Sequence, residues 1–204
     1  MKYVILICLV LTVAAIKAQS FSAELLVSKS GVSPLLSFDT PLFKSEKLSF
    51  SQTGRFGMDY DRENKLVFMM SNLGYSWSPH FKSTAGALFL GEGRISPTLG
   101  LQAVSAKKNR LFLLFPLVTI ESDPQVWLIS AAQFEKELKK ERKGILGITS
   151  LQLFAEGEHV VTIGIIHLGI GKGKFQYGLA SLLSFAGKNF ECKYDPGVYV
   201  KYSL

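Results

Sequence analysis

Hydrophobic and polar positions alternate along almost the whole chain in short segments. In the first of them, Ala23, Leu25 and Val27 alternate with Ser22 and Glu24. A period of two predicts β-strands that bury one face. Turn-forming or charged residues separate the segments. The pattern predicts twelve strands, over Phe21–Ser28, Val32–Phe38, Lys47–Asp59, Leu66–Trp77, His80–Leu90, Arg94–Ser105, Leu111–Glu121, Gln125–Glu135, Ile145–Ala155, His159–Gly171, Phe175–Phe185 and Gly197–Leu204.

The segment Val32–Phe38 is the least regular of these, because Pro34 lies within it and Pro41 follows it. Proline removes a donor from the hydrogen-bond ladder. An irregular segment across the barrel mouth is the alternative, and demoting the first pair of strands leaves ten. The sequence therefore predicts ten to twelve strands. Gly187–Pro196 is expected to be the longest loop.

The last strand places Val198, Val200, Tyr202 and Leu204 on one face and Tyr199, Lys201 and Ser203 on the other. A terminal strand needs a partner for its backbone groups, and pairing with the first strand removes both edges. The fold class that follows is all-β, a closed antiparallel up-and-down β-barrel.

The N-terminus has the composition of a secretory signal peptide. Lys2 precedes an apolar run to Ile16, and Ala18 offers a small residue for cleavage. We expect residues 1–18 to be this signal and residues 19–204 to form one barrel domain, since no linker-like stretch divides them. An uncleaved membrane anchor is the alternative.

Composition narrows the class of protein. Hydrophobic residues make up 48% of the chain but occur in short runs, which favours membrane strands over membrane helices. The net charge of +7 comes without the focused basic clusters that nucleic-acid binding needs. After cleavage Cys192 is the only cysteine, which excludes an internal disulfide and a cysteine-based metal cage.

The polar faces of the strands carry the candidate functional residues. We expect a narrow, largely filled interior with a charged lining, in which Glu24 and Asp59 also take part. A salt-bridge network that fills the lumen is the first interpretation, and an anion path is the second. The predicted lumen-facing residues are Arg55, Lys82, Arg94, Gln102 and His167.

The alternating terminal strand, the signal peptide and the segment Ser96–Gln102 together give a resemblance. The chain resembles the family of small outer-membrane β-barrel proteins of Gram-negative bacteria whose functions are unassigned. The resemblance implies an outer-membrane location, contact with membrane lipid, and recognition by the outer-membrane insertion machinery through Val198, Val200, Tyr202 and Leu204. That family commonly ends on Phe or Trp, and Leu204 departs from this.

The histidines do not form a metal site in the predicted arrangement. His159 and His167 are expected to share a face of one strand but to lie about 26 Å apart, at about 3.3 Å per residue. His80 has no second ligand near it in sequence. The charged run Glu135–Lys143 is interpreted as a solvated turn, with a docking site or anionic-lipid contact as the alternative. No cofactor, metal or catalytic residue is predicted.

Three functions remain open from the sequence. The first is a non-enzymatic outer-membrane barrel acting as a narrow pore, a ligand-binding barrel or a scaffold. The second is an outer-membrane lipid-modifying hydrolase that uses a serine and a histidine at the rim. The third is a soluble periplasmic or secreted barrel that binds a hydrophobic ligand. The sequence favours the first, and predicts no nucleic-acid partner.

Overall fold

The computed structural model describes residues 20–43, 45, 47–60, 65–91, 93–138, 141–186 and 191–204, so the predicted signal peptide lies outside the described residues. Twelve strands make up the described chain. They are β1 (Ser20–Ser28), β2 (Gly31–Pro41), β3 (Leu48–Asp59), β4 (Lys65–Ser76), β5 (Phe81–Leu90), β6 (Arg94–Lys107), β7 (Arg110–Thr119), β8 (Gln125–Glu137), β9 (Arg142–Ala155), β10 (Glu158–Lys172), β11 (Phe175–Ala186) and β12 (Glu191–Ser203). No helix among the described residues is long and apolar enough to cross a membrane.

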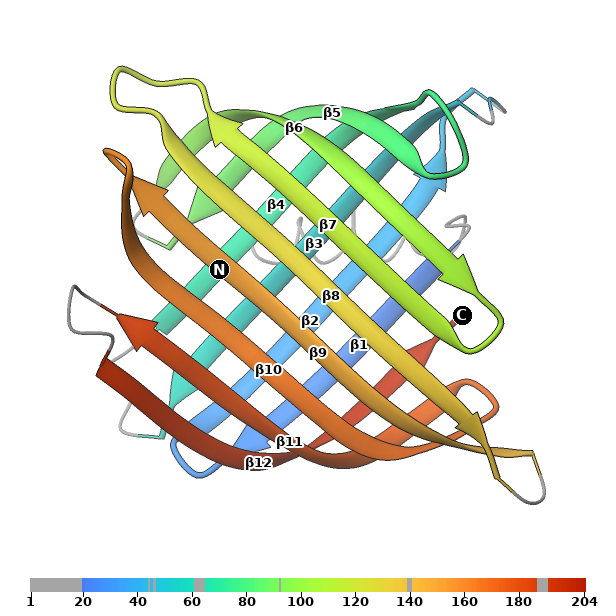
Figure 1. The fold of residues 1–204 in the computed structure, drawn as a ribbon. Coiled ribbons are helices and arrows are strands. Elements are labelled where there is room, and N and C mark those ends of the chain that lie inside the picture. The colour runs from blue at the N-terminus through green and yellow to red at the C-terminus, as the bar shows by residue number, and fades with distance from the viewer. Residues whose placement is uncertain are drawn as a thin grey trace, which may run out of the picture.

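The strands form one closed antiparallel barrel, as the alternating pattern predicts. Each strand pairs with its neighbours in sequence, and β12 closes the wall by pairing with β1, with Leu26 opposite Tyr199. Figure 1 shows the tilted strands around a single wall, with blue β1 beside red β12. The upper strand count is confirmed, since β2 is part of the wall.

Two of the prolines inside strands, Pro34 and Pro116, coincide with a gap in a ladder. The β2–β3 register omits Pro34, and the β6–β7 register omits Pro116. Because proline has no backbone N–H, it cannot complete a rung. The wall tolerates both because each strand also pairs along its other side. One expectation is wrong: β12 starts at Glu191, so most of Gly187–Pro196 is strand and not loop.

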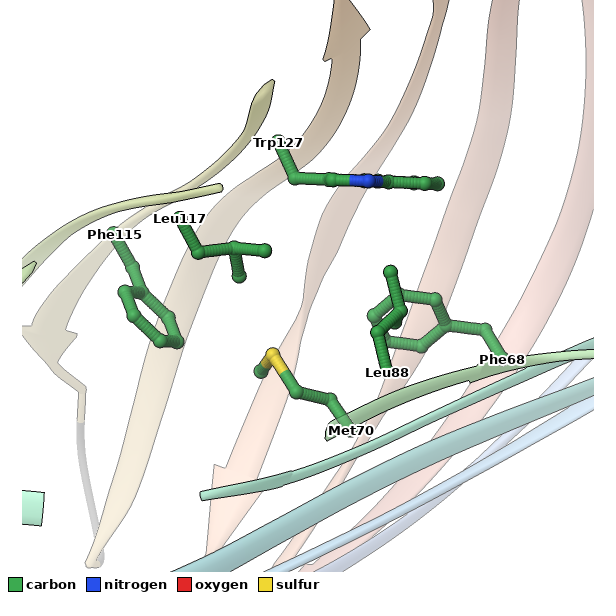
Figure 2. Close-up of a cluster of buried hydrophobic side chains, with 6 residues drawn as sticks. All are labelled: Phe68, Met70, Leu88, Phe115, Leu117 and Trp127. Atoms are coloured by element: carbon green, nitrogen blue, oxygen red, sulfur yellow. The ribbon is translucent and has the colours of Figure 1, made fainter. Parts of the chain in front are cut away.

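Contacts between strands that are not neighbours identify the inner face of the wall. Phe68 on β4 lies against Trp127 on β8, with ring centroids 6.4 Å apart, although three strands separate β4 from β8 in the wall. Such a contact can form only across the interior. Figure 2 shows six apolar side chains converging there from opposite stretches of the wall. They are Phe68, Met70, Leu88, Phe115, Leu117 and Trp127.

The outer face is apolar and exposed. Leu168 and Leu179, for example, retain 60% and 63% of their accessible surface. Exposed aromatic side chains lie near the strand ends, as in the interfacial girdles of membrane barrels. One end of the barrel, where β1 starts and β12 ends, is called the terminal rim; its exposed aromatic residues include Tyr75, Trp77, Phe81, Phe112, Phe134 and Phe175. The opposite end is called the distal rim, and its exposed aromatic residues include Tyr60 and Tyr194.

The two rims differ in charge among the described residues. The terminal rim is mainly basic, with Lys47, Lys107, Lys108, Arg110, Lys136, Arg142, Lys143, Lys172 and Lys174 against Glu135, Glu137 and Glu141. The distal rim is mainly acidic, with Asp59, Glu121, Asp123, Glu156, Glu158, Glu191 and Asp195 against Lys29, Arg94 and Lys193. The barrel therefore has distinct ends. Of the run Glu135–Lys143, the first three residues end β8 and the last two begin β9 at the terminal rim, while residues 139 and 140 lie outside the described residues.

Candidate functional site

The interior polar cluster is organised around Glu24. This residue lies mid-strand on β1, opposite Leu35 of β2 and Lys201 of β12. Partners directly opposite in an antiparallel pair share a face of the sheet. The even positions of β1 face inward, because Leu26 packs with Ile165 of β10 in a second interior cluster. Alternation in β1 thus directs the Glu24 carboxylate into the barrel.

Two side chains from distant strands bind the same oxygen of Glu24. Nη2 of Arg55, on β3, donates to Oε1 of Glu24 at 3.1 Å, and Nε2 of His167, on β10, lies 3.3 Å from that oxygen. Nη1 of Arg55 also donates to Oγ of Ser33 at 3.2 Å. The closed wall separates β1 from β10 by two strands, so the Glu24–His167 contact crosses the interior.

Burial makes these contacts energetically important. Glu24 retains 6% of its accessible surface and His167 retains 8%. A carboxylate removed from water costs several kcal/mol, roughly, unless hydrogen bonds and opposite charge compensate. Arg55 supplies a full positive charge and His167 a second donor, so the carboxylate is held in the ionised, hydrogen-bonded form.

Tyr199, on β12, completes the cluster with a hydroxyl group that has no partner among the described atoms. Its ring meets the ring of His167 edge to face, with centroids 4.6 Å apart, and the residue is 2% exposed. A Cβ built on Gly169 would lie 2.5 Å from the hydroxyl oxygen, so glycine is required there. A buried hydroxyl without a partner costs about 1–3 kcal/mol, and this hydroxyl is free to donate a hydrogen bond.

The arrangement can perform acid–base chemistry. When Nε2 of His167 carries the proton that Glu24 accepts, Nδ1 of the neutral imidazole is left as a base. Nδ1 forms no hydrogen bond in the described part of the chain, and a Cβ built on Gly147 of the adjacent strand would lie 3.7 Å from it. The ring of Tyr199, which carries a hydroxyl donor, packs edge to face against the same imidazole. Orienting carboxylate, base and donor are therefore together.

A second interior cluster lies nearer the terminal rim. Nζ of Lys82, on β5, donates to Oδ2 of Asp39 at 3.1 Å and to Oγ of Ser49 at 2.8 Å. Gln102 of β6 is the direct register partner of Lys82. The Asp39 carboxylate and the Ser49 hydroxyl bind the charged Lys82 ammonium group. This cluster therefore links β2, β3 and β5 across the interior.

Arg94 lies at the distal rim, apart from both clusters. Its guanidinium forms an ion pair with Glu121, in the turn after β7, and its Nε lies 3.4 Å from Oε1 of that carboxylate. Hydrogen bonds from Arg94 and Ser96 hold the pKa of the Glu121 carboxyl below its ordinary value. Of the five residues predicted to line the lumen, the structure thus joins Arg55 with His167, places Lys82 beside Gln102, and separates Arg94.

The other histidines are not arranged for catalysis. Nδ1 of His80 lies 3.1 Å from the carbonyl oxygen of Val104, and Nε2 of His159 lies 2.7 Å from Oγ1 of Thr162. A register shift between His159 and Val161 changes the alternation of β10, so His159 and His167 do not share a face as predicted. The ring of His80 thus contacts a backbone carbonyl, and the ring of His159 contacts a threonine hydroxyl. The rim Ser/His arrangement is therefore replaced by an interior acid–base cluster.

The sequence missed Tyr199 as a functional candidate. The alternation of β12 could have indicated it, because Tyr199 and Lys201 lie on the same face of that strand, and this face adjoins Glu24 of β1. Among the described residues, no group of three or more His, Cys, Asp or Glu is arranged to hold a metal ion.

No protein-family model matches the chain, and no curated protein matches it either. Three solved structures are similar to it in fold. LpxR from Salmonella typhimurium is 7% identical with a TM-score of 0.46, covering 90% of this chain and 99% of its own. OmpTdeltaL8, a loop L8 deletion mutant of OmpT, an outer membrane protein of Vibrio cholerae, is 7% identical with a TM-score of 0.39, covering 91% and 97%. The siderophore receptor PirA from Pseudomonas aeruginosa is 12% identical with a TM-score of 0.33, covering 89% and 41%.

The expectation of a barrel without enzymatic function is corrected here. It rested on the absence of a compact Ser/His motif around His80 or His159. Inside the barrel, however, Glu24 contacts His167, and the ring of Tyr199 packs against the ring of His167. This pairing joins two strands that are not neighbours, across the interior of the closed barrel.

Proposed function

We propose that this chain is an outer-membrane β-barrel enzyme that hydrolyses an ester bond of a lipid at an interior site formed by Glu24, His167 and Tyr199. The observation that carries the proposal is the buried Glu24–His167 pair with an unpartnered Tyr199 hydroxyl beside it. The proposal combines a location, a reaction and a substrate class.

The outer surface supports the membrane location. Soluble proteins rarely expose contiguous apolar patches beyond a few hundred Å², roughly, whereas a membrane barrel requires an apolar band. Large hydrophobic side chains are exposed on strands all round the wall, among them Leu25, Leu73, Leu101, Leu168, Leu179 and Val200. Aromatic residues near both rims fit the two interfaces. A soluble periplasmic barrel would have to cover this surface.

The side-chain geometry supports ester hydrolysis. Nδ1 of His167 accepts a proton from a water molecule, whose oxygen attacks the ester carbonyl carbon. The Tyr199 hydroxyl donates a hydrogen bond to the oxyanion that develops. His167 then returns the proton to the alkoxide as the carbon–oxygen bond breaks, yielding a carboxylic acid and an alcohol. Glu24 keeps the imidazole oriented and stabilises its positive charge, and Arg55 fixes the carboxylate.

The interior lining supports a lipid substrate. Leu26, Ile165, Ala180 and Tyr199 form one buried apolar cluster, with Leu182 packed against it. The larger cluster around Trp127 covers much of the opposite stretch of wall. An ester with an apolar acyl group would find its carbonyl beside the polar cluster and its chain against these residues.

The test uses the purified barrel in detergent micelles with fluorogenic acyl esters and defined phospholipids as substrates. We expect ester cleavage to fall by about 10²–10⁴-fold in H167Q and E24Q. The matched controls H80Q and H159Q should retain activity. Heat-modifiable gel mobility and a detergent requirement report that each variant is a folded membrane barrel. If the wild type cleaves none of these esters, or if H167Q cleaves them at the wild-type rate, the proposed hydrolysis is wrong.

A further inference from the structure

A groove on the outer face of the barrel lies away from the interior site. It encloses about 650 Å³ and runs across β5 to β9 between the terminal rim and the middle of the wall. Its floor includes the small residues Ala103, Ser105, Ser130 and Ala132, and its sides include the large residues Phe81, Phe112, Leu114 and Ile148.

Strand register explains why the groove forms. Ser105 is opposite Phe112, and Phe112 is opposite Ala132, so small and large side chains share one row of the outer face. Small residues surrounded by aromatic and branched ones leave a depression. Phe112 is braced by Phe134, with ring centroids 5.4 Å apart. The depression is therefore part of the packing of the wall.

The floor presents a hydroxyl group that is already satisfied. Oγ of Ser130 lies 2.8 Å from Oγ of Ser150 on the neighbouring strand, so each hydroxyl has a partner. A hydroxyl paired in this way carries little desolvation cost in an apolar medium. The groove is thus suited to an apolar occupant even though serine contributes to its floor.

Two cations lie at the terminal-rim end of the groove. Lys107 and Arg110 are opposite each other, two residues along the strands from the groove pair Ser105 and Phe112, which is about 7 Å. Alternation places both on the face that carries the groove, and both are exposed. Neither forms an ion pair with an acidic residue in the described part of the chain, whereas Lys108 pairs with Glu137 at 3.1 Å.

We propose that this surface binds one anionic phospholipid. Its phosphate lies between Lys107 and Arg110, and one acyl chain lies in the groove toward Ser130 and Ala132. Charge complementarity at the rim and the apolar lining below it select a molecule with both features. The groove extends from the rim toward the middle of the wall, as an acyl chain extends through one leaflet of about 15 Å. The proposal rests on the membrane location proposed above and is independent of the hydrolysis.

The test measures lipid retention by native mass spectrometry after reconstitution with phosphatidylglycerol or phosphatidylcholine and graded removal by detergent. The wild type should retain phosphatidylglycerol preferentially. Because each surface cation contributes roughly a fivefold gain in affinity for an anionic lipid, the double variant K107Q/R110Q should lower that preference by about 30-fold. A132L, which fills the groove, should reduce retention of both lipids.

The matched control is K172Q/K174Q, which removes two exposed cations of the same rim on the β10–β11 turn, away from the groove. The control should retain phosphatidylglycerol as the wild type does. The proposal is overturned if the wild type retains both lipids equally, if the control loses as much as K107Q/R110Q, or if A132L has no effect. A barrel that extracts without detergent would instead refute the membrane location itself.

Discussion

Glu24 and His167 lie 143 residues apart in sequence, yet their side chains meet at 3.3 Å inside the barrel. The two residues belong to β1 and β10, which do not pair with each other, so closure of the whole wall creates the contact. Arg55 joins them through the same carboxylate oxygen. The contacts among β1, β3 and β10 in the interior therefore all involve the buried carboxylate of Glu24.

The first prediction concerns the stability that this acid confers. E24L removes the partner of Arg55 and leaves a buried guanidinium without an opposite charge. We expect the free energy of unfolding to fall by about 3–5 kcal/mol. Urea unfolding in detergent or lipid vesicles, followed by tryptophan fluorescence, measures this change.

The double variant E24L/R55M separates charge burial from lost packing. Because it replaces both members of the pair by apolar residues, we expect it to regain most of the stability lost in E24L. A double variant as unstable as E24L would contradict this explanation and assign the cost to packing.

The second prediction separates function from stability at Tyr199. Removal of its unpartnered hydroxyl in Y199F should leave stability unchanged or raise it by about 1 kcal/mol, since a buried unpaired group is lost. If the hydroxyl stabilises an oxyanion, ester cleavage should nevertheless fall by roughly 10²-fold or more. Parallel unfolding and kinetic measurements check both parts. Unchanged cleavage in Y199F would remove Tyr199 from the mechanism.

The third prediction compares two glycines of β10. A Cβ at Gly169 would lie 2.4 Å from the carbonyl oxygen of Tyr177 and 2.5 Å from the Tyr199 hydroxyl. G169A should therefore destabilise the barrel by about 1–3 kcal/mol, as overpacking does. At Gly164 the nearest atom would be the carbonyl oxygen of Thr149 at 3.7 Å, so G164A should be tolerated. Equal unfolding midpoints for the two variants would show that the close approach at Gly169 relaxes freely.

The fourth prediction concerns the pH dependence at the distal rim. Hydrogen bonds from Arg94 and Ser96 lower the pKa of Glu121 in the folded barrel. A group with a depressed folded pKa stabilises the protein above its unfolded pKa, and this contribution is lost as pH falls through the folded pKa. R94Q should raise the pKa of Glu121 in an NMR titration. Its stability deficit relative to the wild type should be present at neutral pH and disappear in acid. A deficit that persists in acid would exclude this linkage.

The sequence predicted the barrel because alternation is local information. The faces of β1 and β12 follow directly from residues such as Val198 and Tyr199, and their pairing follows from the need to satisfy two edges. Leu111–Glu121 is apolar on both faces, so its orientation required the register, which directs Phe115 and Leu117 inward. The sequence also did not predict that much of the interior is apolar. Alternation alone does not distinguish an apolar residue on the inner face from one on the outer face.

The candidate site was predictable only in its components. Arg55 and His167 are assigned to polar faces by sequence, but their meeting depends on the stagger of strands around the closed wall, which no local pattern specifies. The bulge between His159 and Val161 places His159 on the opposite face of β10 from His167, whereas His167 faces the interior. Such a bulge has no sharp sequence signature, since it is one extra residue in an otherwise regular strand.

The opposite charge of the two rims gives the barrel an electric dipole along its axis. Basic groups gather where β1 starts and β12 ends, and carboxylates gather at the other end. A dipole aligned with the membrane normal has different energies in the two orientations across an applied voltage or an asymmetric bilayer. Acidification neutralises the carboxylates of the distal rim but leaves lysine and arginine charged. At low pH the charge difference between the rims is therefore an excess of positive charge at the terminal rim. A barrel with this charge distribution, once placed in a membrane, would distinguish the two sides electrically.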